Sequence, residues 1–359
     1  MSNHGRRGAF AIAATLACAL LLPSTALAGH DLVIYKQEAH VDLTADEFSA
    51  SVSCNPGDHA LDGMWRIDHA DQDDYVAAIP LITGAVDVTQ AEATSDSTYS
   101  FTFEKNAIGR AQAKIFVTCL ANKTSGDAHQ HTFWSSAPPP GSTLAFTKAD
   151  GSTAGFESTS LPVIDTSTYK WSRSGSCPAG FRLVSPGFRA DTFSTGDPNA
   201  GQIRLYESIS STGSDWSWKF ETSGMAPAST MNLTTSYRCL RIKVSQDSFD
   251  KHKLVFKFNH PVTFNPPKNR VSEGQYNCGD HYKAIVAGFS IPDAGSAPSF
   301  NSNGDGLIDP PVNNTAFNNV YFLGMDPRPK QRAYRFVNRS TTSTYPVALK
   351  ALCLNYRTT

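Results

Sequence analysis

The sequence lacks the patterns that define several large classes of protein. After residue 28 no segment is long and apolar enough to cross a bilayer as a helix, and no long stretch keeps a 3.6-residue apolar period. There is no Cys-x-x-Cys pair of the kind that binds zinc, and no Gly-x-Ser-x-Gly elbow to carry a nucleophilic serine. These absences disfavour a helical protein, a zinc protein and an α/β hydrolase.

The first 28 residues predict a secretory signal peptide. Arg6 and Arg7 precede an apolar run from about Ala9 to Leu22, and Ala26-Leu-Ala28 supplies small residues for cleavage. The run is shorter than the roughly 18 to 20 residues that a spanning helix needs. We therefore expect a mature protein that is secreted or held at the cell surface, with the periplasm as the alternative location.

Three stretches of the remaining chain repeat the same landmarks in the same order. Each has an apolar strand, then a cysteine with a turn, and then a glycine 9 or 10 residues further on. An aromatic strand follows, and a second cysteine closes the copy. The landmarks are Cys54, Gly63, Phe103 and Cys119; Cys177, Gly187, Phe220 and Cys239; and Cys278, Gly288, Phe336 and Cys353.

The landmark segments predict an all-β protein. Tyr99–Phe103 and Trp216–Phe220 alternate apolar and polar residues with period two, and Ser, Gly, Asn and Pro clusters separate such segments. We expect three tandem β-sandwich domains, immunoglobulin-like or jelly-roll-like, each with one internal disulfide. The predicted parts are repeat 1 (29–134), a proline-rich linker (135–142), repeat 2 (143–250) and repeat 3 (251–359). The stiff linker suggests that repeat 1 is the most independent unit.

The cysteines support the same division. Cleavage removes Cys18 and leaves six cysteines, two in each repeat, in a chain bound for an oxidising compartment. The repeat pattern predicts the pairs Cys54–Cys119, Cys177–Cys239 and Cys278–Cys353. Each closed loop would stabilise its repeat by about 4 kcal/mol. Whether each disulfide joins two sheets or two neighbouring strands is left open by the sequence.

The order Cys-Pro-x-Gly, Gly-Phe, Trp-x-Phe and a closing Cys resembles tandem disulfide-containing β domains of secreted bacterial proteins. Repeat 2 carries Cys177-Pro-Ala-Gly180, and repeat 3 is similar in its second half, from Tyr334 to Cys353. Repeats 1 and 3 depart from the pattern at the residue after the first cysteine. The resemblance implies a β fold and secretion, and it brings no catalytic residues.

Two groups of residues are candidate binding sites. A weak Ca²⁺ site is the one cofactor suggested by the sequence, because four oxygen-bearing residues stand at loop positions 1, 3, 5 and 9. These are Asn301, Asn303, Asp305 and Asp309. Val312 stands where a calcium loop needs Glu, so an ordinary turn is the alternative. Trp134 and Trp171 have no counterparts in the other repeats and are the candidate sugar-binding pair, whereas Trp216 and Trp218 are expected in the core.

Acidic residues are dense from Asp58 to Asp74, and this density suits either a solvated loop, which we favour, or a Ca²⁺ site, although the spacing matches no defined calcium loop. Net charge also differs between the repeats: it is −10 for 29–142, 0 for 143–250 and +7 for 251–359. Such a gradient would favour head-to-tail self-association, and random drift of charge is the alternative. Contact with an acidic polysaccharide or a membrane surface would use the basic residues Lys251, Lys253, Lys257, Arg328, Lys330, Arg332 and Arg335.

The leading functional hypothesis is a non-enzymatic extracellular protein with a structural, adhesive or matrix role. A carbohydrate-binding array that uses Trp134 and Trp171 is the alternative, and a secreted hydrolase is the third. Nucleic acid is not an expected partner of an exported chain.

Overall fold

The computed structural model describes residues 32–43, 47–69, 86–105, 111–122, 156–160, 169–193, 202–223, 230–245, 251–292 and 319–356. Strands make up nearly all the regular structure in these ranges, so the predicted all-β class is confirmed. Within the described ranges, none of the helical structure has the length and apolar character to cross a membrane.

The strands follow the repeats. Repeat 1 supplies β1 (Ile34–Leu43), β2 (Glu47–Ser53), β3 (His59–His69), β4 (Val86–Ala93), β5 (Thr98–Lys105) and β6 (Ala111–Leu120). Repeat 2 supplies β7 (Phe156–Ser160), β8 (Tyr169–Ser176), β9 (Phe181–Phe193), β10 (Gln202–Ile209), β11 (Asp215–Ser223) and β12 (Thr230–Arg241). A small ribbon follows, of β13 (Lys243–Ser245) and β14 (Lys251–Lys253). Repeat 3 supplies β15 (Phe256–Lys257), β16 (Val262–Phe264), β17 (Arg270–Asn277), β18 (Tyr282–Ser290), β19 (Val320–Arg328), β20 (Gln331–Asn338) and β21 (Val347–Asn355).

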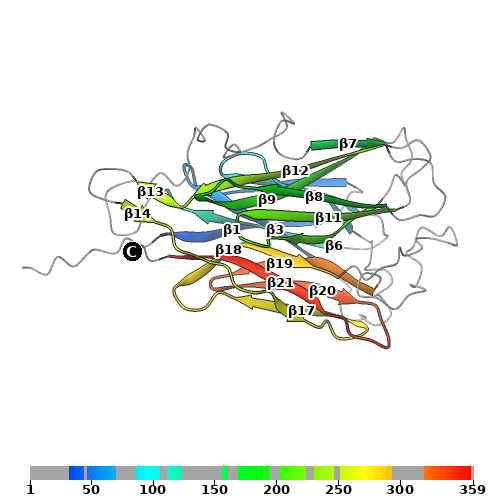
Figure 1. Cartoon of the computed structure of the whole chain (residues 1–359). Helices are drawn as coiled ribbons and strands as arrows, with labels where there is room; N and C mark the ends of the chain where they lie inside the picture. The colour runs from blue at the N-terminus through cyan, green and yellow to red at the C-terminus, as the bar shows by residue number, and fades with distance from the viewer. Residues whose placement is uncertain are drawn as a thin grey trace, which may run out of the picture.

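Three large antiparallel sheets are each built by two repeats. Their strand orders are β1-β6-β3-β19-β20-β17, β15-β21-β18-β10-β11-β8 and β2-β5-β4-β9-β12-β7, and β16 also pairs with β21. Every repeat thus divides its strands between two sheets, which pack on each other as a β-sandwich. Figure 1 shows the green strands of repeat 2 at the top and the orange and red strands of repeat 3 at the bottom.

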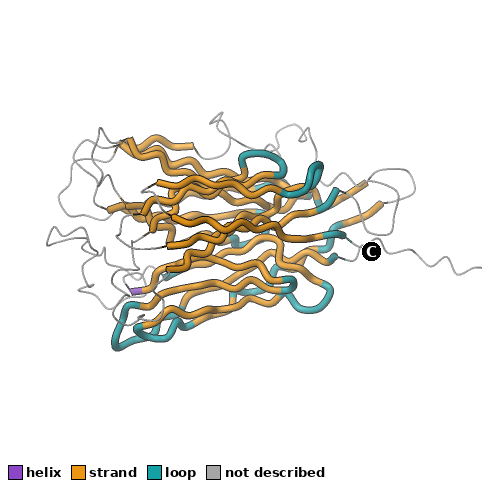
Figure 2. The backbone as a smooth tube through the Cα atoms, turned by 180° about the vertical axis from the view of Figure 1, so that it is seen from behind, coloured by secondary structure: helices purple, strands orange, loops and turns teal. Residues whose placement is uncertain are grey.

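The three repeats close into a ring. With β15 and β16 counted as one strand, because both pair with β21, the third strand of each repeat pairs with the fourth strand of the repeat before it. β9 pairs with β4, β18 with β10, and β3 of repeat 1 with β19 of repeat 3. We call these contacts the first seam (β4 with β9), the second seam (β10 with β18) and the third seam (β19 with β3). Figure 2 shows the strands running along a common direction through the body.

The ring changes one expectation. The prediction of three tandem β-sandwich units, each with one internal disulfide, is confirmed. The expectation that repeat 1 is the most independent unit is wrong, because each repeat shares its sheets with the other two. A half-sheet of three strands has an unpaired edge on the side of its third or fourth strand, and pairing with the neighbouring repeat satisfies the backbone groups there. Repeat 1 makes two such contacts, as do the other repeats.

The disulfides are the three predicted pairs, and each joins two sheets. Cys54 follows β2 and is bonded to Cys119 on β6, which lies in the other sheet of repeat 1. The other two bonds, Cys177–Cys239 and Cys278–Cys353, repeat this arrangement. Each disulfide therefore fixes the two halves of one sandwich to each other.

The aromatic strands form the core, as expected. Trp216 and Trp218 are 3% and 1% exposed, and Phe101 and Tyr334 are fully buried. Phe101, Trp218 and Tyr334 occupy equivalent places, because each pairs with a residue of the fourth strand beside a seam. The alternation of large aromatic and polar residues places one face of β5, β11 and β20 in the interior.

Candidate functional site

Of the six residues that the sequence singled out as binding sites, Trp171 alone lies in the part of the chain that the structure describes. The calcium candidates Asn301, Asn303, Asp305 and Asp309 lie outside the described residues, and so does Trp134. Trp171 lies on the edge strand β8, where its backbone pairs with Phe220. In the ranges given above, no three His, Cys, Asp or Glu side chains form a group that could hold a metal ion.

The acidic stretch of repeat 1 is a strand from His59 to His69, so the prediction of a solvated loop is wrong for that part, whereas Asp58 lies in the turn segment before the strand. Asp62 and Asp68 lie on β3, while Asp71, Asp73 and Asp74 lie outside the described residues. Apolar residues of the same strand, including Leu61 and Trp65, are buried and hold β3 in the core. Its carboxylates therefore face the neighbouring repeat.

A charged network crosses the third seam. Arg66 of repeat 1 donates from Nη1 to Oδ2 of Asp326 in repeat 3, at 3.0 Å, and from Nε to Oδ1 of Asp68, also at 3.0 Å. Arg335 of repeat 3 donates to the same Asp68 oxygen. These four side chains are between 12% and 26% exposed. Because they are partly buried and form a network, they contribute more than an isolated surface pair, which is worth about 0.2–1 kcal/mol.

A second acid and base lie deeper in the third seam. Asp62 and Arg332 are both 2% exposed, with 4.0 Å between Oδ2 and Nε. Oδ2 of Asp62 accepts a hydrogen bond from the backbone N–H of Ala287 at 3.1 Å, and Arg332 donates to Oγ1 of Thr118 at 2.7 Å. Burial raises the pKa of Asp62 to about 8, and the Arg332 guanidinium opposes this shift. Burial therefore favours the protonated form of this carboxyl group.

These contacts alter the expected partners of repeat 3. Arg332 and Arg335 were among the basic residues predicted to contact polysaccharide or membrane, but both lie in the third seam. The acidic residues of repeat 1 thus pair with basic residues of repeat 3 within one chain.

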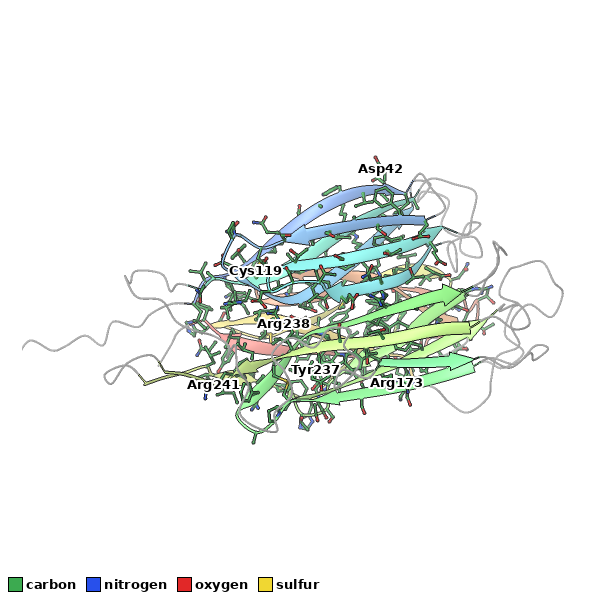
Figure 3. The ribbon with its side chains drawn as sticks, turned by 90° about the horizontal axis from the view of Figure 1, so that it is seen from above. Asp42, Cys119, Arg173, Tyr237, Arg238 and Arg241 are labelled. Carbon is green, nitrogen blue, oxygen red and sulfur yellow. A yellow bond between two sulfur atoms is a disulfide. The ribbon has the colours of Figure 1, made fainter. Side chains whose placement is uncertain are left out.

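The first seam has the same polarity, because repeat 1 supplies acids and repeat 2 supplies arginines. Arg189 Nη1 lies 3.5 Å from the buried Glu92 carboxylate. Arg238, which is 1% exposed, forms an ion pair with Asp96 and donates to the Asp96 carbonyl at 2.9 Å. Burial lowers the pKa of Arg238 to about 10, so it stays charged at neutral pH. Figure 3 shows Arg238 between the strands of the two repeats.

The second seam is joined by a carboxylate of repeat 2. Glu207 on β10 accepts a hydrogen bond from the hydroxyl of Ser290 on β18 at 2.6 Å. Within its own repeat it accepts hydrogen bonds from Ser217 and Lys219, both at 3.1 Å. The Lys350 ammonium of repeat 3 donates to the Ser211 carbonyl at 3.2 Å. All three seams therefore contain charge-assisted hydrogen bonds, which are roughly twice as strong as neutral ones.

A glycine allows close backbone approach at every seam. A Cβ atom on Gly187 would lie 2.7 Å from the Cα of Glu92, and one on Gly288 would lie 2.5 Å from the Ser208 carbonyl oxygen. At the third seam the glycine is on the opposite strand, where a Cβ on Gly324 would overlap the Trp65 carbonyl. Any larger residue would push the repeats apart.

The sequence identified two of these glycines but not the third. Gly63 was matched to Gly187 and Gly288, yet it packs under the ring of Tyr99, away from the seam. Met64 takes the equivalent place in repeat 1, because it pairs three residues before the second cysteine, as the two seam glycines do. The spacing of 9 rather than 10 residues in repeat 1 was the available signal.

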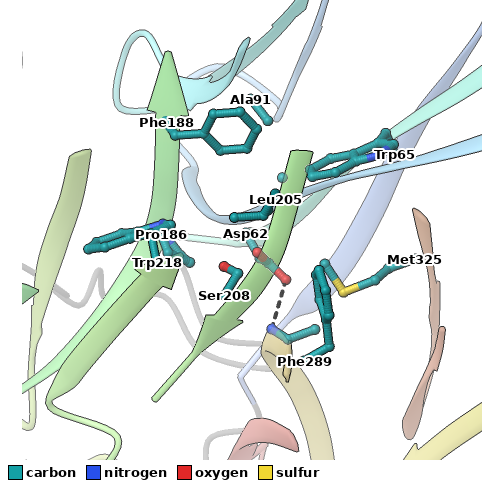
Figure 4. Close-up of a pocket in the computed structure, with 12 residues that line it drawn as sticks. Asp62, Trp65, Ala91, Pro186, Phe188, Leu205, Ser208, Trp218, Phe289 and Met325 are labelled. Carbon is teal, nitrogen blue, oxygen red and sulfur yellow. Dashed lines mark hydrogen bonds between the residues drawn. The ribbon is translucent and has the colours of Figure 1, made fainter. Parts of the chain in front are cut away.

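The three seams surround a small cavity, shown in Figure 4. Trp65, Phe188 and Phe289 line it from equivalent positions, each pairing four residues before the second cysteine of its repeat. Asp62 and Ser208 add polar atoms to the lining. The cavity volume is about 20 Å³, which is room for about one water molecule. A sugar or a peptide side chain does not fit there.

The chain matches no protein-family model, and a search of curated proteins finds no significant match. The site is therefore interpreted from its own contacts and distances. That geometry joins repeats through paired charges, close backbone contacts and aromatic packing.

Proposed function

We propose that this protein is a non-enzymatic extracellular protein, secreted or held at the cell surface, with a structural, adhesive or matrix role. The closed ring of three disulfide-linked repeats carries the proposal. Its charged side chains pair across seams at which sheets are completed, so the repeats stabilise one another. A body of this kind suits an environment without chaperones and with active proteases.

The disulfides are compatible with an extracellular location. Each is internal to one repeat, and each holds two sheets together, which limits local opening of the sandwich. The resemblance to tandem β domains of secreted bacterial proteins and the predicted signal peptide favour the same compartment.

The structural role is preferred to carbohydrate binding because of where the aromatic residues lie. Trp65, Trp216 and Trp218 are at most 5% exposed and serve the core. Among the residues whose side chains the structure describes, Val33 and Val262 are the only large hydrophobic ones that are strongly exposed. Of the five tryptophans, Trp134 and Trp171 remain as candidates for a sugar platform.

The test compares binding with turnover on purified mature protein. We expect no hydrolysis of a panel of esters, peptides and glycans, and resistance to proteases that is lost when the disulfides are reduced. Turnover on any substrate class would overturn the proposal. Glycan binding that Trp171→Ala abolishes, and that the exposed control Ser51→Ala keeps, would replace it with the carbohydrate-binding alternative.

A further inference from the structure

We propose that repeat 1 can be exchanged between two copies of this chain, so that repeat 1 of each copy completes the ring of the other. Repeat 1 meets the rest of its chain through the first and third seams, and both are non-covalent. Its disulfide, Cys54–Cys119, is internal, so exchange breaks no covalent bond.

Charge determines which surface can take the place of repeat 1. Its carboxylates meet arginines of both neighbours, in the pairs Asp68–Arg335, Glu92–Arg189 and Asp96–Arg238. One pair runs the other way, Arg66–Asp326. This pattern fits another copy's repeat 1 as well as the chain's own, whereas repeats 2 and 3, with net charges of 0 and +7, do not supply its acids. The partner is therefore a second copy of this chain.

The covalent connection is long enough for exchange. β6 ends at Leu120 and β7 begins at Phe156, so residues 121–155 join repeat 1 to repeat 2. A chain of 35 residues can reach roughly 120 Å when extended, against a radius of gyration of about 21 Å for a compact chain of this size. Repeat 1 can thus occupy a neighbouring ring while it stays attached to its own chain.

Exchange re-forms every contact that it breaks. The closed and exchanged forms therefore differ only in the connection and in the entropy of association, which is why domain swapping is a low-cost route to dimers. Reciprocal exchange gives a dimer, and exchange in one direction gives an open chain of copies. This inference rests on the contacts at the seams and does not depend on the proposed function. The proposed function would only give the exchange a biological purpose.

Two charge variants test the proposal. Arg335→Asp places two carboxylates together at the third seam, and Asp68→Arg places two guanidinium groups there. Each variant alone has this clash in both the closed and the exchanged form. In a mixture, exchange restores one opposite pair in each of the two rings. We expect a species of twice the monomer mass in sedimentation velocity after the mixed chains pass through mild denaturant with disulfides intact.

The matched control is one chain with both substitutions, which restores the opposite pair internally and should stay monomeric under the same treatment. A mixture that remains monomeric, or dimers that form equally in each variant alone, would overturn the proposal. If a single variant does not fold, wild-type chains with two different tags are refolded together at high concentration. Capture through one tag should then recover the other, and recovery of one tag only would also overturn it. Neither result bears on enzymatic turnover, so the proposed function is judged separately.

Discussion

Replacing Gly187 by alanine tests the closeness of the first seam. The new Cβ would lie 2.7 Å from the Cα of Glu92 and 2.8 Å from the carbonyl oxygen of Ala91. Carbon atoms in favourable contact are about 3.5–4.0 Å apart, so β9 and β4 have to separate by roughly 0.8 Å. Both obstructing atoms belong to the backbone, and no side-chain rotation can relieve the contact.

The cost follows from that separation. Overpacking of a well-packed interior costs about 1–3 kcal/mol, and each weakened backbone hydrogen bond adds up to about 1 kcal/mol. Alanine recovers roughly 0.5–1 kcal/mol because it is less flexible than glycine in the unfolded chain. We therefore expect Gly187→Ala to lower the free energy of unfolding by about 2–3 kcal/mol.

Gly180→Ala is the control, because it lies in the same repeat and has no seam contact. Gly180 has a φ of +90°, and a Cβ there meets nothing within 4 Å. The loss of unfolding free energy in Gly180→Ala should reflect only the strain of alanine in the left-handed backbone conformation, about 1–2 kcal/mol. Denaturant unfolding with the disulfides intact measures both variants. A loss at Gly187 smaller than the loss at Gly180 would refute the close seam.

Three further predictions concern buried polar groups. Because the pKa of Asp62 is raised to about 8 in the folded state, its own contribution to stability should be greatest below about pH 4 and fall towards pH 8, by up to about 1.4 kcal/mol per pH unit. Asp62→Asn should remove this contribution from the pH dependence of unfolding measured from pH 5 to 8. Glu104 pairs with both Glu47 and Asp87, and burial with the Glu47 charge raises its pKa, so Glu104→Gln should stabilise the protein by about 0.5 kcal/mol at pH 7 and lose that advantage at pH 4. Asn338 is fully buried and donates to the carbonyls of Pro266 and Ser343 at 2.9 and 3.0 Å. Asn338→Asp should therefore lower the free energy of unfolding by about 2–3 kcal/mol. An unchanged midpoint of thermal unfolding would contradict this.

Local patterns were sufficient to predict the strands and the disulfides. The period-two segment Trp216–Phe220 lies in β11, and its tryptophans are buried as expected. The cysteine pairs followed from repetition, since each repeat has one cysteine before its third strand and one in its sixth. Such signals are carried by neighbouring residues, so they can be detected without knowledge of the fold.

The seams could not be predicted in the same way. Backbone groups at a strand edge are alike in every sequence, and nothing local states which strand of another repeat will pair with them. Gly187 and Gly288 were visible as landmarks, but their contacts lie on strands of the preceding repeat. Asp68 looked like a loop residue because acidic residues are dense around it, although its partner Arg335 is 267 positions away.

The charge gradient predicted attraction between repeats 1 and 3, yet it carried no information on whether the two repeats belong to one chain. Repeats in one chain face each other at an effective concentration of the order of millimolar, which exceeds that of a second copy under dilute conditions. Closure of the third seam within the chain is therefore favoured first, and contact between copies requires that a closed ring open. Because the same pairs, including Asp68–Arg335, serve both forms, protein concentration and the 35-residue connection decide which copy supplies repeat 1.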